Sequence, residues 1–458
     1  MAFDLELTPA HHDLIERTHR FAEDVVRPVA GRYDRAEEFP WPVLERAAEE
    51  GFYNALFYRD LIADPTGLSL PLFMEELFWG CAGIGLAIVM PALALSALAQ
   101  ASTPDQLLRW APGCFGEPGD LRLAALAVSE PQAGSDVAGL ETQARRDGDD
   151  WIIEGRKLFI GNGGIADVHV VNAVVDPELG TKGQAMFVVP KDTPGLKLVR
   201  KLEKLGCRAS HTAELEFERC RVPGDHLLGG DEKLEARLER ARSGESRSAA
   251  LGAFEQTRPM VAAQALGVAR AAFEFASHYA GEREAFGEPI AENQGVSFPL
   301  ADVATELDAA RLLTWRAAWM AANDIDFHLA EGSMSKLAAS EVAVRATERA
   351  VQVCGGRGYI RDLPVEKWYR DAKLYTIFEG TSEIQRLVIG RTLPESAPEG
   401  PLHHRLPKKD GIGRRFGRGT PARSELGRAL EKLARNTPDP LLRLPGKVVV
   451  APGKTKNR

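Results

Sequence analysis

The chain has 458 residues, of which 44% are hydrophobic and 27% charged, a balance that is typical of a globular protein and excludes a fibrous or largely disordered one. This length exceeds what one hydrophobic core usually serves, so we expect two or three domains. The net charge of −8 is unevenly spread, because residues 394–458 contain 15 Lys and Arg against 6 Asp and Glu, which gives this tail a charge of +9.

The N-terminus, the apolar stretches and the cysteines indicate the cellular setting. The first six residues are acidic and lack the basic start and apolar run of a signal peptide. The longest apolar stretch, residues 83–98, is short for a membrane span and contains Pro91, so we expect a buried helix. The five cysteines form no C-x-x-C pair, which argues against a disulfide framework. We therefore expect a cytoplasmic protein without a membrane span.

Residues 1–122 are predicted to form an N-terminal helical domain. Thr8 before Pro9 is typical of a helix start, and apolar residues follow at helical spacing. Residues 72–98 are almost entirely apolar, as in a helix that is buried on most sides.

Residues 123–230 are predicted to form a middle β domain. Short apolar stretches, such as 168–171 and 185–189, are separated by Gly, Pro, Asn and Asp. Residues 213–217 alternate strictly between apolar residues and Glu, which is typical of a half-exposed strand. We expect a small barrel or sandwich.

The rest of the chain is predicted to be helical up to residue 393. Residues 251–393 contain long amphipathic helices that indicate a four-helix bundle, and these are listed here by range: 258–282, 294–324, 327–355 and 380–392. Residues 231–250, with repeated Glu and Arg, are predicted to be an exposed insertion. Residues 394–458 are rich in Pro, Gly and Arg and are predicted to be a loosely attached extension.

The segment around Glu379 carries the strongest chemical signal. Phe378 provides an apolar wall, which raises the pKa of a neighbouring carboxyl by desolvation. Gly380 allows another group to approach the backbone closely. Thr381 or Ser382 would cap the next helix, whose free N–H groups can hold a polar ligand. The segment alone leaves open a second interpretation, a capped helix with a surface glutamate.

Three further segments have the composition of ligand-binding loops. Residues 129–136 are mostly small and can bring backbone amides and hydroxyls up to a ligand. In residues 282–287, Arg283 can pair with a pyrophosphate and Phe286 can cover a ring. Residues 352–359 form a glycine-rich helix exit. Each segment also has a simpler interpretation. Residues 129–136 can be a plain loop, residues 282–287 can hold a surface charge and a core aromatic residue, and residues 352–359 can be a helix C-cap.

Together, and in this order, these four segments resemble the acyl-CoA dehydrogenase family over residues 1–393. The resemblance implies an α+β multidomain fold with an N-terminal helical domain, a central β-barrel and a C-terminal four-helix bundle. It implies FAD-dependent conversion of a saturated acyl-CoA to the trans-2-enoyl-CoA in fatty acid β-oxidation, with Glu379 as the catalytic base. It also implies electron transfer to an electron-transfer flavoprotein, and a homotetramer or dimer that binds FAD across a subunit interface.

The resemblance further assigns individual residues to the ligands. Those expected against the flavin ring are Leu126, Val128, Ser129, Gly134, Phe159 and Gly161, and Ser135 is expected to contact both the cofactor and the CoA arm of the substrate. Those expected against the ADP half or the ribityl chain are Arg283, Phe286, Gln294, Gln352, Gly355, Gly356, Thr381 and Glu383. Those expected near the substrate are Ser135, Glu255, Arg258, Phe378 and Gly380. We expect no metal site, because the ten histidines form neither H-x-x-x-H nor H-E-x-x-H.

Several positions depart from the residues that are usual in the family. Where Trp-x-Thr or Trp-x-Ser is common, Phe159 can still stack on a ring, but Gly161 has no hydroxyl. Glu383 stands where Gln is common. Some members place the base on the first long bundle helix, and the matching position here is Thr257, which favours Glu379; the neighbouring Glu255 is a weaker substitute.

The sequence leaves alternatives on substrate and function. An acyl-CoA oxidase, or a dehydrogenase of a carrier-protein thioester, would use the same fold. A nucleic-acid-associated flavoprotein rests on the basic tail alone, and we expect no such partner because most basic tails are simply solvated. Gly85, Leu86 and Val89 are small or apolar in the helix that matches the wall of the family's acyl cavity, so we expect an aliphatic acyl chain of some length.

Overall fold

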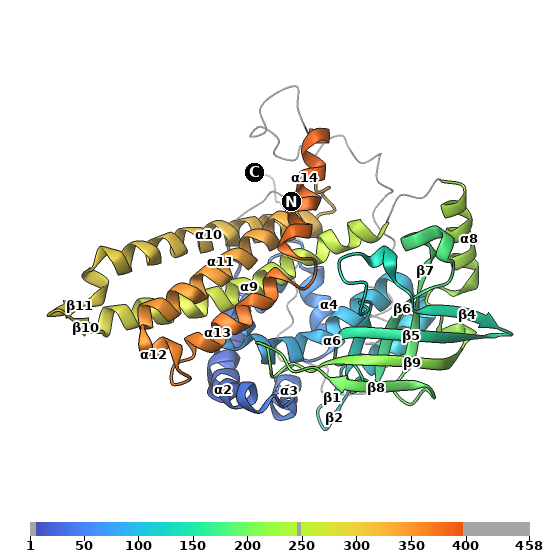
Figure 1. Ribbon diagram of the computed structural model, residues 1–458, viewed down its shortest axis with the longest axis horizontal. Helices are drawn as coiled ribbons and strands as arrows, with labels where there is room; N and C mark the ends of the chain where they lie inside the picture. The colour runs from blue at the N-terminus through green and yellow to red at the C-terminus, as the bar shows by residue number, and fades with distance from the viewer. Residues whose placement is uncertain (1–5, 245–248, 397–458) are drawn as a thin grey trace, which may run out of the picture.

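The computed structural model of this chain describes residues 6–244 and 249–396, and places side chains in residues 6–244 and 257–393. A long helical bundle and a β-sheet extend in opposite directions, and the N-terminal helices pack against both (Figure 1). This succession of helical, β and helical parts confirms the fold class expected from the sequence. The predicted basic extension lies outside the described residues, except that the last helix ends at Ser396.

The N-terminal part is helical, as predicted. Its helices are α1 (Pro9–Phe21), α2 (Arg27–Ala36), α3 (Trp41–Glu49), α4 (Ala55–Ala63), α5 (Ser69–Gly80), α6 (Ala82–Ala101) and α7 (Pro104–Trp110). Thr8 caps α1, because its hydroxyl accepts from the His11 N–H at 3.3 Å. Among the described residues, α6 is the one helix long and apolar enough to cross a membrane, and 72% of its apolar window is buried inside the protein. The expected buried helix is therefore confirmed.

The middle part is a curled seven-stranded sheet. Its strands are β3 (Ala124–Ala127), β4 (Gln143–Asp147), β5 (Asp150–Gly161), β6 (Val168–Val174), β7 (Gln184–Pro190), β8 (Leu196–Lys201) and β9 (Thr212–Pro223). The order is β3-β6-β4-β5-β9-β8, with β7 paired to β6. The strict alternation in β9 predicted that Glu214 faces solvent, and this was wrong. Glu214 is buried, and the Arg200 side chain on β8 donates to its carboxylate at 2.8 Å.

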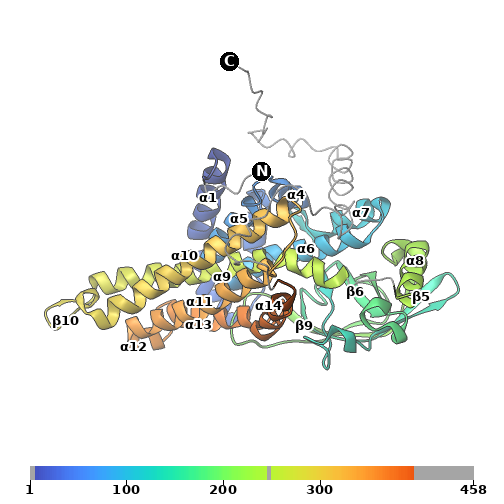
Figure 2. The same ribbon diagram turned by 90° about the horizontal axis from the view of Figure 1, so that it is seen from above.

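The C-terminal part is a bundle of long helices. Its members are α9 (Ala249–Glu282), α10 (Gln294–Ala322), α11 (Glu331–Cys354), α12 (Gly356–Tyr359), α13 (Val365–Ala372) and α14 (Ser382–Ser396). Figure 2 shows α9, α10 and α11 running side by side toward the tip of the bundle, with α14 near their other end. The sequence predicted one fourth helix, but both α13 and α14 pack on α11 and share that place.

The segment expected as an exposed insertion, residues 231–250, contains a docked helix, α8 (Gly230–Arg242). Arg146 on β4 pairs with Asp231 at 2.9 Å, and the Leu234 side chain is buried. Helix α9 then begins at Ala249, nine residues before the predicted start. Part of this segment thus forms a helix that packs on the 3₁₀ turns η4 (Pro177–Gly183) and η5 (Gly224–His226), and its last residues belong to α9.

Helix α13 ties the parts of the molecule together through Arg370 and Asp371. The Arg370 guanidinium donates to both carboxylate oxygens of Asp34 on α2, at 3.0 and 2.7 Å, and to the Leu205 carbonyl at 3.0 Å. The buried Asp371 carboxylate accepts from the Cys207 N–H at 2.5 Å. We call these five residues the Arg370 clamp. It fixes the start of the segment that carries the predicted base.

Candidate active site

Glu379 lies in a short loop between the 3₁₀ turn η7 (Lys373–Thr376) and α14. Its φ of 53° is in the left-handed region, which costs a residue with a side chain about 1–2 kcal/mol. The loop is therefore held from outside. The Gln385 side-chain amide donates to the Glu379 carbonyl at 3.2 Å and to the Gly380 carbonyl at 2.9 Å. The next residue, Gly380, is also left-handed, with φ of 89°.

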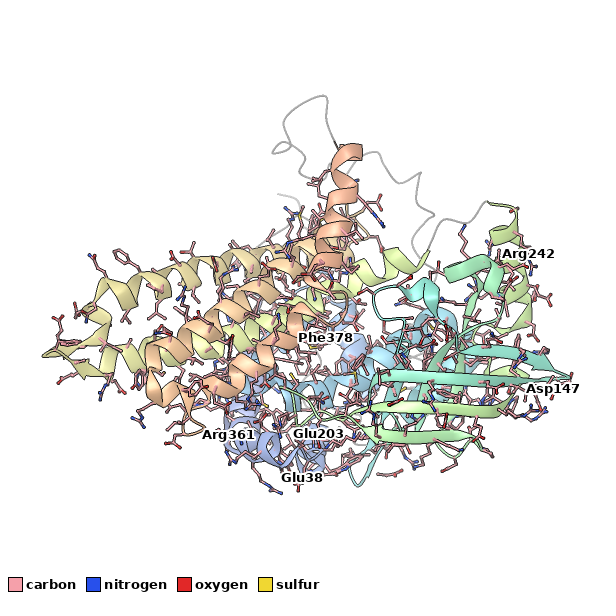
Figure 3. The ribbon with its side chains drawn as sticks, in the orientation of Figure 1. Glu38, Asp147, Glu203, Arg242, Arg361 and Phe378 are labelled. Carbon is pink, nitrogen blue, oxygen red and sulfur yellow. The ribbon has the colours of Figure 1, made fainter. Side chains whose placement is uncertain are left out.

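A second support of this loop is Lys336, which is fully buried on α11. Its ammonium donates to the Tyr375 carbonyl at 2.6 Å and to the Gly380 carbonyl at 2.7 Å. Phe378 packs its ring edgewise on Tyr375, with the centroids 5.4 Å apart. Figure 3 labels Phe378 at the junction of the bundle and the sheet. The loop thus lies where the two parts of the molecule meet.

The environment of the Glu379 carboxyl combines an apolar wall with two cations. Burial raises the pKa of Glu379, and the positive charges of Lys336 and Arg258 oppose that rise. Arg258 is buried on α9 and donates to the Ser333 hydroxyl at 2.5 Å. A carboxyl whose pKa is raised by burial is suited to accept a proton at neutral pH.

The start of α14 resolves one choice that the sequence left open. The Thr381 hydroxyl accepts from the Ile384 N–H at 3.2 Å, so Thr381 is the cap and Ser382 is the first helical residue. Glu383 is exposed in the first turn, where hydrogen bonds from its own backbone N–H and from Thr381 lower its pKa. The helix start therefore lies directly beside the Glu379 loop.

The loop at residues 129–136 is held by a buried ion pair. The Lys157 ammonium on β5 donates to the Glu130 carboxylate at 2.7 Å and to the Val128 carbonyl at 2.9 Å. The Leu158 N–H donates to the Ser129 carbonyl at 2.9 Å. These contacts bring the end of β3, with Leu126 and Val128, next to the end of β5. The loop beyond Glu130, with Gly134 and Ser135, is exposed.

The end of β5 presents Phe159 outward. Its φ is 64° and its side chain is 67% exposed, because the pairing of β5 with β9 shifts between Lys157 and Ile160. At Gly161, a Cβ would lie 2.8 Å from the Met90 sulfur on α6, so this methionine fills the space of the missing side chain. An exposed aromatic ring beside half-buried Leu126 and Val128 fits a flat ligand ring.

The remaining expected cofactor residues lie at the other end of the bundle. They surround the hairpin β10 (Glu284–Ala285) and β11 (Glu288–Pro289) and the exit of α11, and they are Arg283, Phe286, Gln294, Gln352, Gly355 and Gly356. A pocket there is lined by Tyr279, Arg283, Ile290, Val353, Cys354, Gly355, Gly356 and Arg357. The Phe286 ring is fully exposed, so it is not a core aromatic. A guanidinium beside glycine amides suits a pyrophosphate.

The structure places the expected cofactor residues around the β10–β11 hairpin and the exit of α11 far from the Glu379 loop of the same chain. Lys336 and Gln352 lie sixteen residues apart on α11, so the groups are separated by about 24 Å along this helix. The Glu255 side chain lies outside the described part of the chain.

Sequence reasoning missed three residues that hold the site, namely Glu130 as an ion-pair partner, Lys157 and Lys336. The sequence did contain a signal for the two lysines: Lys157 occupies an inward position of a predicted strand, and Lys336 lies on the Ala- and Ser-rich face of a predicted helix.

The comparisons with known proteins agree along the whole described chain. The N-terminal, middle and C-terminal domains of acyl-CoA dehydrogenases match residues 8–116, 125–220 and 247–393. The mitochondrial short-chain specific acyl-CoA dehydrogenase of Bos taurus is 40% identical over 392 residues, which cover 85% of this chain and 91% of the relative.

Solved structures give the same result. Butyryl-CoA dehydrogenase from Megasphaera elsdenii aligns with a TM-score of 0.76 and 32% identity, over 85% of this chain and 100% of that one. A chain from a structure described as the electron transferring flavoprotein of Acidaminococcus fermentans aligns with a TM-score of 0.74 and 33% identity. The alignment covers 85% of this chain and 99% of that one. A prolyl acyl carrier protein oxidase aligns with a TM-score of 0.72 and 28% identity, over 85% of this chain and 100% of that one.

Proposed function

The chain belongs to the acyl-CoA dehydrogenase family and is an FAD-dependent oxidoreductase, and from this premise we propose that Glu379 removes the α-proton of its acyl-CoA substrate. One observation carries the proposal: Glu379 is held in a strained, supported loop where burial raises its pKa. Strain of this kind persists only where surrounding contacts enforce it, and it concentrates at functional sites.

The chain's own groups account for the proton transfer. The Glu379 carboxylate accepts the α-proton, and its raised pKa makes it a stronger base than an exposed glutamate. The Glu379 N–H donates to the thioester carbonyl and stabilises the enolate charge that develops there. Phe378 and Tyr375 pack their rings together in the same loop and add apolar surface beside the backbone of Glu379. When bound, FAD supplies the redox chemistry by accepting the β-hydrogen as a hydride.

The residues expected to hold FAD divide between two copies of the chain. The ring would lie on the face made by Leu126, Val128, Ser129, Gly134, Ser135, Phe159 and Gly161, close to Thr381 and Glu383. The ADP half would lie at the distal pocket of another copy, with Arg283, Phe286, Gln294, Gln352, Gly355 and Gly356. The separation of the two groups and the full exposure of Phe286 support a homodimer or homotetramer.

We propose a short saturated acyl chain, in place of the longer chain that the small residues of α6 suggested. A Cβ at Gly85 would lie 3.0 Å from the Phe78 ring, so the ring fills the space beside this glycine. Leu86 and Val89 are buried in the core. The relatives named for short-chain and butyryl substrates support the same choice.

The remaining expectations are kept as proposals. Electrons would pass to an electron-transfer flavoprotein, the kind of protein for which one of the similar solved structures is named. A cytoplasmic setting is supported by five cysteines that are all buried and free. The boundaries at residues 122, 230, 250 and 393 are kept as domain limits. The role of residues 397–458 lies outside the described chain.

Anaerobic titration of the purified holoenzyme with saturated acyl-CoAs of increasing length tests this function. We expect butyryl-CoA to bleach the flavin absorbance more completely than octanoyl-CoA, and Glu379→Gln to stay coloured with both. Bleaching by a carrier-protein thioester alone would favour the carrier-protein alternative. Rapid recolouring in air would favour an oxidase. Failure of every thioester to bleach the wild-type protein would overturn the proposal.

A further inference from the structure

Three lysines are buried among the residues whose side chains the structure describes, and they differ in what holds their charge. Lys157 pairs with the Glu130 carboxylate at 2.7 Å. Lys367 pairs with the Asp371 carboxylate at 2.5 Å. Lys336 instead directs its ammonium at two backbone carbonyls of the Glu379 loop. A buried ammonium normally requires a counter-charge, so this arrangement calls for an explanation.

The two carbonyls bracket Glu379 on both sides. Tyr375 lies four residues before it and Gly380 directly after it, and each carbonyl accepts from the same nitrogen, at 2.6 and 2.7 Å. The single side chain of Lys336 therefore closes the loop into a ring. Gln385 reinforces only the C-terminal side, because it bonds the Glu379 and Gly380 carbonyls.

Resting on the function proposed above, we propose that Lys336 is a positioning residue that fixes the left-handed backbone of Glu379 and supplies the buried positive charge that keeps its carboxylate ionised. Lys336 acts through Glu379 and contacts neither substrate nor cofactor in this role. The cost of burying a lysine without a hydrogen-bonded carboxylate is then offset by its interaction with the base.

The charged groups around the pair give the sign of the effect. Glu379 faces Lys336 from α11 and Arg258 from α9, and both lower its pKa against the larger rise from burial. Burial lowers the pKa of Lys336 to about 8, and the positive charge of Arg258 lowers it as well. The negative charges of Glu379 and of Glu383 on α14 act in the opposite direction and raise the pKa of Lys336. Removing Lys336 takes away one of the two cations, so the pKa of Glu379 must rise further.

The experiment compares Lys336→Met with Lys204→Met in the FAD-loaded protein. Lys204 is a matched control because burial lowers its pKa to about 8 too, and it donates to the Ser210 carbonyl and to the Thr212 hydroxyl at 2.9 Å, away from Glu379. The first readout is the infrared titration of the Glu379 carboxyl, isolated by difference against Glu379→Gln. It needs no substrate, so it decides the role of Lys336 even if no acyl-CoA bleaches the flavin.

We expect Lys336→Met to move the titration midpoint of Glu379 upward by about one pH unit or more, and Lys204→Met to leave it unchanged. The rate of flavin reduction at pH 7 should fall by about tenfold or more, and raising the pH should recover part of it. A midpoint shift no larger than that of Lys204→Met would overturn the proposal.

Lys336→Gln guards against a variant that does not fold and separates the two contributions. The amide keeps a donor for the loop carbonyls and removes the charge. We therefore expect its midpoint to shift as in Lys336→Met, while its rate at high pH lies closer to that of the wild type. A wild-type midpoint in a folded Lys336→Gln would overturn the electrostatic part of the proposal.

Discussion

The two ends of the helical bundle are built on opposite principles. At the Glu379 end, the loop is bonded from α11 and α14, and buried groups of the same chain fix its geometry. At the other end, Phe286 stands fully exposed and glycines line an open pocket. Groups of one chain thus hold the Glu379 loop in place, whereas the pocket at the β10–β11 hairpin is open and is suited to contact a cofactor or another copy of the chain. Four substitutions, from the largest expected effect to the smallest, test this contrast.

Replacing Glu379 by Gln tests the closed end directly. Removal of a general base should lower the rate of flavin reduction by on the order of 10³-fold or more. The FAD spectrum and the melting temperature should stay close to the wild type, because the amide occupies the same volume. Stopped-flow absorbance at the flavin band measures the rate. Glu232→Gln, at an exposed position of α8, is the control, and an equal loss in both variants would contradict the assignment.

Replacing Arg370 by Ala tests whether the closed end depends on the clamp. The change leaves Asp34 buried without its guanidinium partner, and such a loss costs about 3–5 kcal/mol. Denaturant unfolding followed by circular dichroism should register this as a lower midpoint. Arg361→Ala, at an exposed position in the loop before α13, is the control and should stay within about 0.5 kcal/mol. A loss below about 1 kcal/mol in Arg370→Ala would show that the clamp is dispensable.

Replacing Arg283 by Ala tests the open end. Loss of charge-assisted hydrogen bonds to a pyrophosphate costs about 1.5–3 kcal/mol, so the Kd for FAD should rise by roughly tenfold to a hundredfold. Fluorescence titration of the apoprotein with FAD gives the affinity. The maximal rate at saturating FAD should change little, because Glu379 lies at the other end of α11. A lower maximal rate with an unchanged Kd for FAD would contradict the assignment of Arg283 to cofactor binding.

Replacing Gly161 by Ser tests how tightly the ring-binding face is filled. The new side chain meets the Met90 sulfur at 2.8 Å, and overpacking of this kind costs about 1–3 kcal/mol. Because methionine is flexible, we expect the lower part of that range, with a small decrease in melting temperature. The double variant with Met90→Ala should recover the stability lost at Gly161. Failure of the second change to compensate would show that Met90 is not the obstacle.

The sequence predicted the succession of helical, β and helical parts because hydrophobic periodicity is a local property. It also predicted the desolvated setting of Glu379, since Phe378 lies next to it in the chain. It could not predict Lys336, because the carbonyls that this lysine bonds are about forty residues away and pass close only in the folded bundle. The helix α8 was missed for a different reason: its charged residues are also typical of an exposed loop, and their ion-pair partners Arg146 and Asp176 lie far away in the chain.

Other differences arise from backbone geometry that no propensity encodes. The outward position of Phe159 depends on a register shift between β5 and β9, which is a property of the strand pair. The need for a glycine at position 161 depends on Met90, seventy-one residues earlier. Both features depend on contacts between residues that are far apart in the chain. The sequence therefore shows that Phe159 and Gly161 differ from the residues usual in the family, but it does not show why.

The Arg370 clamp also has a consequence for how the molecule loses its structure. One guanidinium and one carboxylate of α13 bond α2 and the loop at residues 205–207, so the helical and β parts share buried polar partners. If α13 unfolded alone, the buried Asp34 carboxylate would lose its guanidinium partner, and if the loop at residues 205–207 unfolded, Asp371 and Arg370 would each lose a backbone hydrogen-bond partner. The three parts are separable in the sequence, yet they should melt in a single calorimetric transition, with the calorimetric and van't Hoff enthalpies in agreement.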